Sequence, residues 1–265
     1  MFGAILGDII GSPYEFDLFN IKTKHFPMFS PYSTFTDDSV MTLAVGNAIM
    51  DTKNKNDDDL LKKNLILSMQ TLGRKYPNAG YGANFRFWLA SDTPKPYGSF
   101  GNGSAMRVSS VAWLFDSIDE VRRVARLTAE ISHNHPEGIK GAESVACAIF
   151  LSRKGYDKNY IKTFVSENFG YNLNRTCDQI RPKYRHVESC METVPEAMIA
   201  FFESTDFEDC IRTSVSLGGD CDTLTAIAGS IAEGYYGVPQ HLKTECLNRL
   251  TDDLKDILVK FQASI

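Results

Sequence analysis

Apolar residues recur along most of the chain at the spacing of amphipathic helices. Residues 60–72 and 250–261 would each bury one apolar face. Residues 117–120 form a capping box, and apolar residues follow it at helical spacing. Pro136 and Gly155 mark the two ends of another helix over residues 136–154. The pattern therefore predicts a largely helical protein.

Further helices are expected at residues 40–50, 105–115 and 223–236, the last of which ends at Gly237. A second capping box at residues 205–208 would begin one more helix. Alternating patterns typical of strands are scarce, and the best candidate, residues 184–187, is short. We therefore predict an all-α fold that is a compact assembly of many helices, with residues 1–265 forming a single domain.

Three glycines in the first apolar segment, Gly3, Gly7 and Gly11, follow one another at intervals of one helical turn. Glycine costs about 1 kcal/mol relative to alanine inside a helix, so three on one face need a reason. Close approach to the backbone of a neighbouring helix supplies that reason. We prefer this packing role to phosphate binding.

Composition and charge narrow the class of protein. Hydrophobic residues make up 43% of the chain and charged residues 23%, as in globular proteins. The net charge of -5 means that nucleic acid is not the default partner, although the sequence leaves a local basic groove open as an alternative. No stretch reaches the ~18 apolar residues of a membrane span. Asp8 interrupts the apolar start, which no Lys or Arg precedes, so a signal peptide is not expected. The six cysteines lack a C-x-x-C pair, which favours free thiols and a cytoplasmic location.

Two acidic segments lie far apart in the chain, each at the start of an apolar helix. The first contains Thr36, Asp37 and Asp38, and the second contains Asp220 and Asp222, followed by Thr223. Either segment alone could simply cap its helix. Together they supply carboxylates and hydroxyls, the hard ligands of Mg²⁺, Mn²⁺ or Ca²⁺ rather than Zn²⁺. Gly218 and Gly219 would allow the tight turn before the second segment, and Cys221 would point away from a metal.

Two other segments carry candidate chemistry. Residues 97–107 form a glycine-dense loop, whose backbone amides could cradle a phosphate or could form only a turn. His133 and His135 stand at a helix start, without a third soft ligand for zinc, and their role could be structural. Asp8 and Glu15 complete the set, although each could be an ordinary solvated acid.

These motifs occur in an order that resembles the ADP-ribosylglycohydrolases, which include the dinitrogenase-reductase-activating glycohydrolase. The matching segments span residues 1–238, and they are Gly7-Asp8-Ile9-Ile10-Gly11 with Glu15, Thr36-Asp37-Asp38, residues 101–107 (GNGSAMR), residues 133–138 (HNHPEG) and Gly218-Gly219-Asp220-Cys221-Asp222-Thr223. Ser39 departs from the family pattern, which commonly has a second Thr there, and leaves the carboxylates intact. The chain is also short for the family.

The resemblance implies an all-helical fold with a central cleft that holds two divalent cations, Mg²⁺ or Mn²⁺, and it implies hydrolysis of the glycosidic bond to ADP-ribose. By position, the metal ligands would be Thr36, Asp37, Asp38, Asp220, Asp222 and Thr223. Glu15 would lie at the reacting ribose and would share the catalytic role with Asp37, Asp38 and Asp222. The diphosphate would be held by Gly98, Ser99, Phe100, Gly101 and Asn102, and His133 would line the cleft.

The acceptor that carries the ADP-ribose stays open: arginine, serine, a nucleic-acid base or a small metabolite. Two other functions also stay open. One is a non-catalytic ADP-ribose reader or antitoxin-like module, which would show no turnover. The other is a different metal-dependent hydrolase acting on a small nucleotide conjugate. The expected partner is an ADP-ribosylated protein or small molecule, with no membrane partner.

Overall fold

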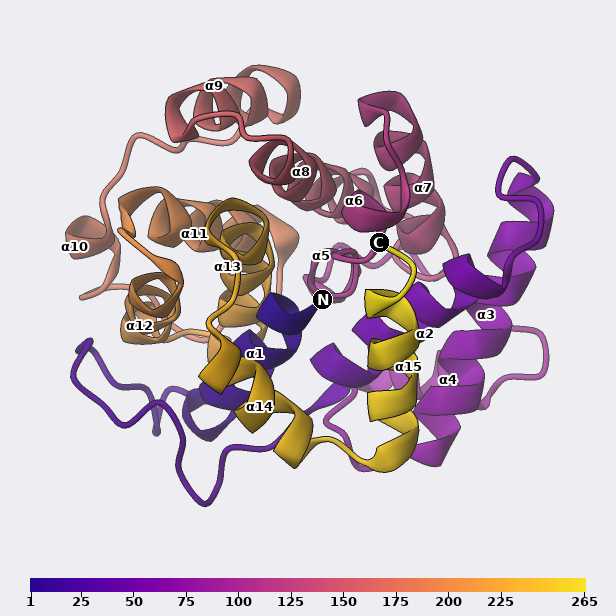
Figure 1. Ribbon diagram of the computed structural model, residues 1–265, viewed down its shortest axis with the longest axis horizontal. Helices are drawn as coiled ribbons and strands as arrows, with labels where there is room; N and C mark the ends of the chain where they lie inside the picture. Colours follow the sequence, from indigo (N-terminus) through magenta and orange to yellow (C-terminus); the bar gives the residue numbers. More distant parts are fainter.

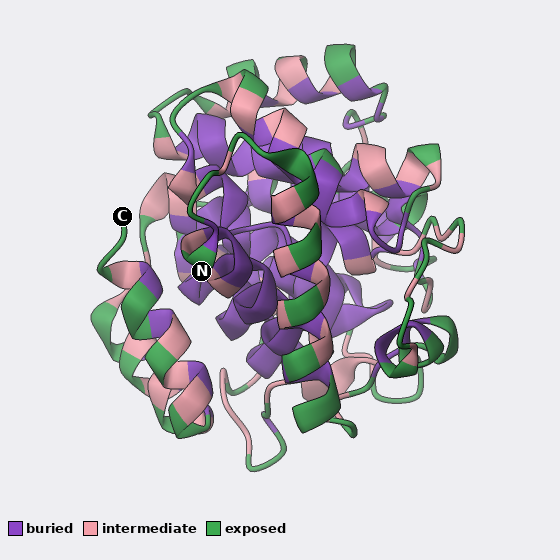
Figure 2. Cartoon of the chain, turned by 90° about the vertical axis from the view of Figure 1, so that its right-hand side faces the viewer, coloured by how far each residue is buried: buried purple, intermediate pink, exposed green.

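Two helices without a polar face form the centre of the molecule. In the computed structural model, which describes residues 1–265, all of α1 (Phe2–Gly11) is buried, as are residues 221–233 of α13 (Cys221–Tyr236). A helix that is apolar on every side has to lie inside other elements. The two helices lie side by side near the middle of the ribbon (Figure 1), where the buried residues gather (Figure 2).

The glycines of α1 explain how close these two helices come. A Cβ atom at Gly3 would overlap the carbonyl oxygen of Gly229, and one at Gly7 would overlap that of Thr225. A Cβ atom at Gly11 would lie 2.6 Å from the Cα atom of Asp222. The predicted packing role is therefore confirmed, and the contact sets the start of α13 against the end of α1.

The remaining helices surround this pair. α13 also packs against α8 (Pro136–Arg153), α11 (Cys190–Glu203) and α12 (Phe207–Leu217), while α2 (Asp37–Asp51) packs against α1, α3 (Asp58–Lys75) and α15 (Asp252–Gln262), as Figure 1 shows. The other elements are η1 (Ser12–Tyr14), α4 (Ala83–Ala90), α5 (Gly103–Met106), α6 (Val111–Leu114), α7 (Ile118–Glu130), α9 (Lys158–Phe169), α10 (Cys177–Ile180) and α14 (Gln240–Arg249).

The all-α prediction is confirmed. The only pairing of β type is an isolated bridge between Gly101 and Ser189, and residues 184–187 form no strand. All six cysteines are free thiols inside the protein. No helix combines the length and the apolar character that crossing a membrane requires.

Two local predictions were wrong. Residues 105–115 do not form one helix, because the chain leaves α5 at Arg107 and turns again before α6; the Arg107 side chain is buried and donates to the carbonyl oxygen of Thr128, 2.7 Å away. The helix after residue 205 is capped by Asp206 instead of Thr205. The carboxylate of Asp206 accepts from the Asp209 amide at 2.8 Å, and a charged acceptor suits a helix start.

Candidate active site

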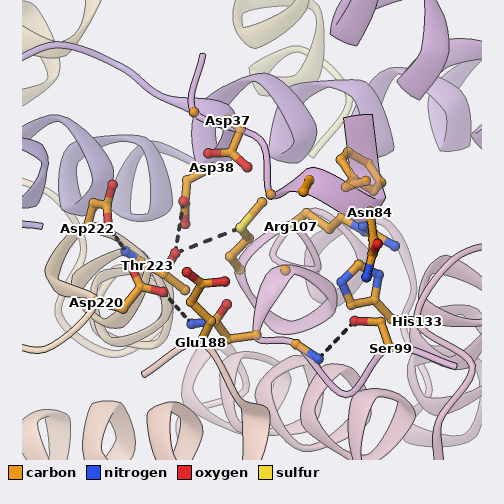
Figure 3. Close-up of a pocket in the computed structure, with 18 of the residues that line it drawn as sticks. Asp37, Asp38, Asn84, Ser99, Arg107, His133, Glu188, Asp220, Asp222 and Thr223 are labelled. Carbon is orange, nitrogen blue, oxygen red and sulfur yellow. Dashed lines mark hydrogen bonds between the residues drawn. The ribbon is translucent and has the colours of Figure 1, made fainter. Parts of the chain in front are cut away.

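The two acidic segments meet at the junction of α1, α2 and α13. Thr223 Oγ1 donates to Asp38 Oδ2 at 3.0 Å and so joins the start of α13 to the start of α2. Carboxylate oxygens of Asp8, Asp38 and Asp222 lie within 4.8 Å of one another, and those of Glu15, Asp220 and Asp222 form a second such group. Asp222 belongs to both groups, so the acids form one continuous cluster. Its members Asp38, Asp220 and Asp222 lie on the left of Figure 3.

Asp8 belongs to this cluster and organises the start of α2. Its carboxylate accepts from the amide and hydroxyl of Thr36, at 2.8 and 2.7 Å, and from the amide of Ser39 at 3.0 Å. The hydroxyl of Ser39 donates to the same carboxylate. Asp8 is therefore buried and fully bonded, and the reading of it as a solvated acid was wrong. An acid inside an otherwise apolar helix was the signal in the sequence.

Glu15 reaches the cluster from the segment that follows η1. Ser12 and Pro13 end α1 as a 3-10 turn, and Glu15 comes directly after this turn. Its carboxylate lines the cavity beside Asp220 and Asp222. The ring of His186 approaches the Glu15 carbonyl oxygen, with its Nδ1 at 3.1 Å.

Burial and mutual repulsion keep these carboxyl groups protonated to unusually high pH. Burial, followed by the charge of Asp220, raises the pKa of Glu15 to about 7, and burial raises the pKa of Asp8 to about 6. Burial also raises the pKa values of Asp37, Asp38 and Asp222 well above their usual range. Asp38 Oδ1 is buried and has no hydrogen-bond partner. Such a set of acids without basic partners suits a divalent cation.

Thr36 and Asp37 lie differently from the remaining residues of the two acidic segments. Thr36 is the N-cap of α2, and its hydroxyl is engaged by Asp8 and faces no part of the cavity. Asp37 does line the cavity, but it lies outside both carboxylate groups. Its amide donates to the carbonyl oxygen of Ala79 at 2.8 Å, which ties the start of α2 to the segment before α4.

A cavity of about 250 Å³ extends from the acids to the glycine loop and His133. Figure 3 shows the acids on one side and Ser99, His133 and Asn84 on the other. Several lining residues had no individual role predicted from the sequence. They are Gly80, Gly82, Ala83, Asn84, Phe85, Tyr97, Gly103, Met106, Arg107 and Glu188. Some come from segments without a recognisable motif, whereas Tyr97, Gly103, Met106 and Arg107 belong to the glycine-dense loop of residues 97–107.

The glycine loop divides into residues that face the cavity and residues that do not. Ser99, Gly101 and Asn102 line it, whereas Gly98 and Phe100 do not. The amide of Gly98 is occupied by Asn134 Oδ1 at 2.7 Å, and the ring of Phe100 packs edge-on against His135. The backbone amides of Ser99 and Phe100 make no hydrogen bond within the protein, so two donors of this loop stay available.

Asn102 connects the glycine loop to the acid cluster. Its Nδ2 donates to Asp220 Oδ2 at 2.7 Å and to Thr193 Oγ1 at 3.1 Å. Its backbone amide donates to the carbonyl oxygen of Glu188 at 2.8 Å. The polar groups of Asn102 therefore hold Asp220 and the segment around Glu188 in place.

A model of the ADP-ribosylglycohydrolase family matches residues 1–264. The chain belongs to this family. It is 26% identical to the human ADP-ribosylhydrolase ARH3, over 90% of this chain and 84% of that protein. It is 27% identical to the ADP-ribosyl-[dinitrogen reductase] glycohydrolase of Rhodospirillum rubrum, over 77% of this chain and 69% of that protein.

A solved structure, described as an ADP-ribosylglycohydrolase-related protein complex, shares the fold of this glycohydrolase. The TM-score is 0.71 at 21% sequence identity, with 100% of this chain and 97% of the other covered. The structural likeness shows the all-α fold. The family match and the named relatives show that the chain is a glycohydrolase that hydrolytically reverses ADP-ribosylation.

Proposed function

We propose that this glycohydrolase cleaves the bond between ribose C1″ of ADP-ribose and its acceptor in a reaction that depends on two divalent cations, Mg²⁺ or Mn²⁺. One observation carries the proposal. The two acidic segments and Glu15 converge at one end of a cavity whose other end offers neutral hydrogen-bond donors. The acidic end of the cavity suits the ribose of the substrate, and the end with hydrogen-bond donors suits the diphosphate.

The cations would be held by Asp38, Asp220, Asp222 and Thr223, with Asp37 and Thr36 completing the set that the family resemblance implies. The unpartnered Asp38 Oδ1 and the raised pKa values of the acids support this assignment. When bound, the cations would polarise the ribose hydroxyls and offset the negative field of the acids, which would otherwise repel a diphosphate. Asp8 would keep Thr36 and Ser39, and with them the turn into α2, in position.

Glu15 is our candidate for proton transfer at the scissile bond. The Glu15 carboxyl lines the cavity beside Asp220 and Asp222. Burial, followed by the charge of Asp220, raises its pKa in the metal-free protein, so this carboxyl group can exchange a proton with a leaving group or with water. Cleavage at C1″ develops positive charge on the sugar, which the surrounding carboxylates stabilise. Asp37, Asp38 and Asp222 would share this electrostatic role.

The diphosphate would lie along the glycine loop. Ser99 lines the cavity, and its free amide supplies a donor. The amide of Phe100 is also free, although Phe100 is not among the lining residues. His133 stands beside Gly101 and Gly103. Burial, together with the charge of Arg107, holds the pKa of His133 well below its usual range, so the ring is neutral. We also propose that residues 1–265 act as one domain, since 73 buried residues form one continuous hydrophobic core. We place this domain in the cytoplasm because its six cysteines are free thiols.

The acceptor is to be identified with a panel of substrates that carry ADP-ribose on arginine, serine, a nucleic-acid base or a small metabolite. Release of free ADP-ribose is measured with Mg²⁺, with Mn²⁺ and with EDTA. We expect turnover on at least one substrate, and only with metal. Binding of ADP-ribose without turnover across the panel would favour a reader or antitoxin-like module, and cleavage only of other nucleotide conjugates would favour a different hydrolase.

Glu15→Gln separates catalysis from binding within the same experiment. We expect turnover to fall about 10²-fold or more, while calorimetry shows ADP-ribose affinity within a few-fold of wild type. Asp17→Asn is the matched control, because it lies on the same segment and keeps an oxygen to accept from the His186 amide. Equal losses of affinity and turnover in Glu15→Gln would assign Glu15 to substrate binding instead.

A further inference from the structure

Arg107 is a buried cation that no carboxylate neutralises. Its side chain is 1% exposed, it takes part in no salt bridge, and it lines the cavity at the end of α5. Its Nη2 donates to the carbonyl oxygen of Thr128 at 2.7 Å and to Ser132 Oγ at 2.8 Å. Burying a charge without an opposite charge costs free energy, which indicates that Arg107 has a role beyond packing.

The bond from Arg107 decides where the hydrogen of the Ser132 hydroxyl goes. Arginine can only donate, so Ser132 Oγ has to accept from it. The other neighbour of this oxygen is His133 Nδ1, at 2.9 Å, and Ser132 is fully buried. If Nδ1 were the donor, the hydroxyl hydrogen would be buried without an acceptor, which is unfavourable. The hydroxyl therefore donates to Nδ1.

The other ring nitrogen of His133 then carries the proton and faces the glycine loop. A Cβ atom at Gly103 would lie 3.1 Å from His133 Nε2, and one at Gly101 would lie 3.5 Å from it. The ring is held near those of Phe85 and Tyr97, with centroids 6.2 and 5.7 Å away. Nε2 has no hydrogen-bond partner in the protein, so its N–H is available to a ligand.

We propose that Arg107 and Ser132 are positioning residues that fix His133 as the Nε2–H tautomer, so that the ring offers a neutral donor to an anionic oxygen bound along the glycine loop. The identity of that anion as the diphosphate of ADP-ribose rests on the proposed function, whereas the tautomer does not. A fixed tautomer gives the substrate a hydrogen-bond donor that is in place before binding. Binding then carries no free-energy cost for rearranging the hydrogen bonds around His133.

Nuclear magnetic resonance of protein labelled with ¹⁵N-histidine tests the tautomer directly, without substrate or metal. The His133 signals are identified by their loss in His133→Gln. We expect Nδ1 to resonate as an unprotonated nitrogen and Nε2 as a protonated one in wild type. In Ser132→Ala, which removes the donor to Nδ1, we expect the two signals to move toward a mixture of tautomers.

Calorimetric titration with ADP-ribose on the same samples links the tautomer to binding. Ser132→Ala should lose about tenfold in affinity, the effect expected when one hydrogen bond to a charged group is weakened. Ser109→Ala is the control: this buried serine has no partner for its hydroxyl, so neither the His133 signals nor the affinity should change. Arg107→Met should change the tautomer in the same direction as Ser132→Ala.

An Nδ1–H tautomer in wild type would overturn the proposal. So would a Ser132→Ala or Arg107→Met variant that loses affinity while the His133 signals stay in place, because the affinity would then not depend on the tautomer; in Arg107→Met this outcome would point to a direct contact between Arg107 and the anion. A wild type that shows the expected tautomer but binds no ADP-ribose would overturn the proposed function and leave the role of Arg107 and Ser132 standing.

Discussion

Thr223 donates a hydrogen bond to Asp38 across 3.0 Å, although 185 positions separate the two residues in the chain. Each residue stands in the first turn of its helix, and both helices pack against α1. The hydroxyl of Thr223 uses its hydrogen on Asp38, so its oxygen keeps lone pairs that can face a cation. This bond is the direct link between the two acidic segments.

Asp38→Ala and Asp222→Ala should weaken metal binding severely, because each removes a hard oxygen ligand from the cluster and Asp222 belongs to both of its carboxylate groups. Removing a residue that only hydrogen-bonds to a metal ligand costs about 10- to 100-fold in metal affinity. Removing a ligand itself should therefore cost at least as much. Calorimetric titration with Mn²⁺ measures the effect. Asp59→Ala, an exposed acid in the first turn of α3, should bind Mn²⁺ like wild type. Unchanged affinity in both cluster variants would contradict the assignment.

Chelation should destabilise the protein without unfolding it. A ligand that binds only the folded state adds about 2.7 kcal/mol at a hundredfold excess over its Kd, so EDTA should lower the Tm and Mn²⁺ should restore it. The helical circular dichroism should persist, because 73 residues form the core without any metal. Asp38→Ala should raise the Tm of the metal-free protein, since repulsion and an unpartnered buried oxygen both disappear. Loss of helical signal on chelation would make the metals structural.

The stability of the metal-free protein should fall as the pH rises from about 4 to about 7. Folding raises the pKa of Asp8 from 3.8 to about 6 and that of Glu15 from 4.5 to about 7, so the folded state holds protons that the unfolded chain has already released. Stability then decreases with pH across this window by linkage. Thermal melts in EDTA across this range measure the slope. The gain in Tm on adding Mn²⁺ should be larger at the higher pH, and a rising slope in EDTA would contradict the buried acids.

Gly7→Ala tests the contact between α1 and α13 that brings the acids together. A methyl group there would overlap the backbone of Thr225, which cannot move aside as a side chain can. Overpacking costs about 1–3 kcal/mol, and a backbone clash should reach or exceed the upper end of that range in urea unfolding. Gly82→Ala is the control, because a Cβ atom there meets nothing within 4 Å. A Gly7→Ala variant as stable as wild type would show that the two helices can separate freely.

The sequence by itself determined the helical class, most helix positions and the family. Helix periodicity, caps and end signals are local, so residues 136–154 were predicted to within one residue of α8. The acids of the two segments were also found from the sequence, because carboxylates and threonines beside glycines are a compact chemical signal. The spacing of Gly3, Gly7 and Gly11 even indicated a close helix contact, although it did not name the partner.

Only the tertiary structure decided which groups meet and what their surroundings do to them. Asp8 is a buried acceptor because α1 runs against α13, and nothing near it in sequence indicated Thr36 and Ser39 as its partners. Arg107 interrupts a predicted helix because its acceptors lie on and just beyond α7, at Thr128 and Ser132. Such contacts join residues that are distant along the chain. They depend on packing and on the cost of burying polar groups, neither of which a local pattern records.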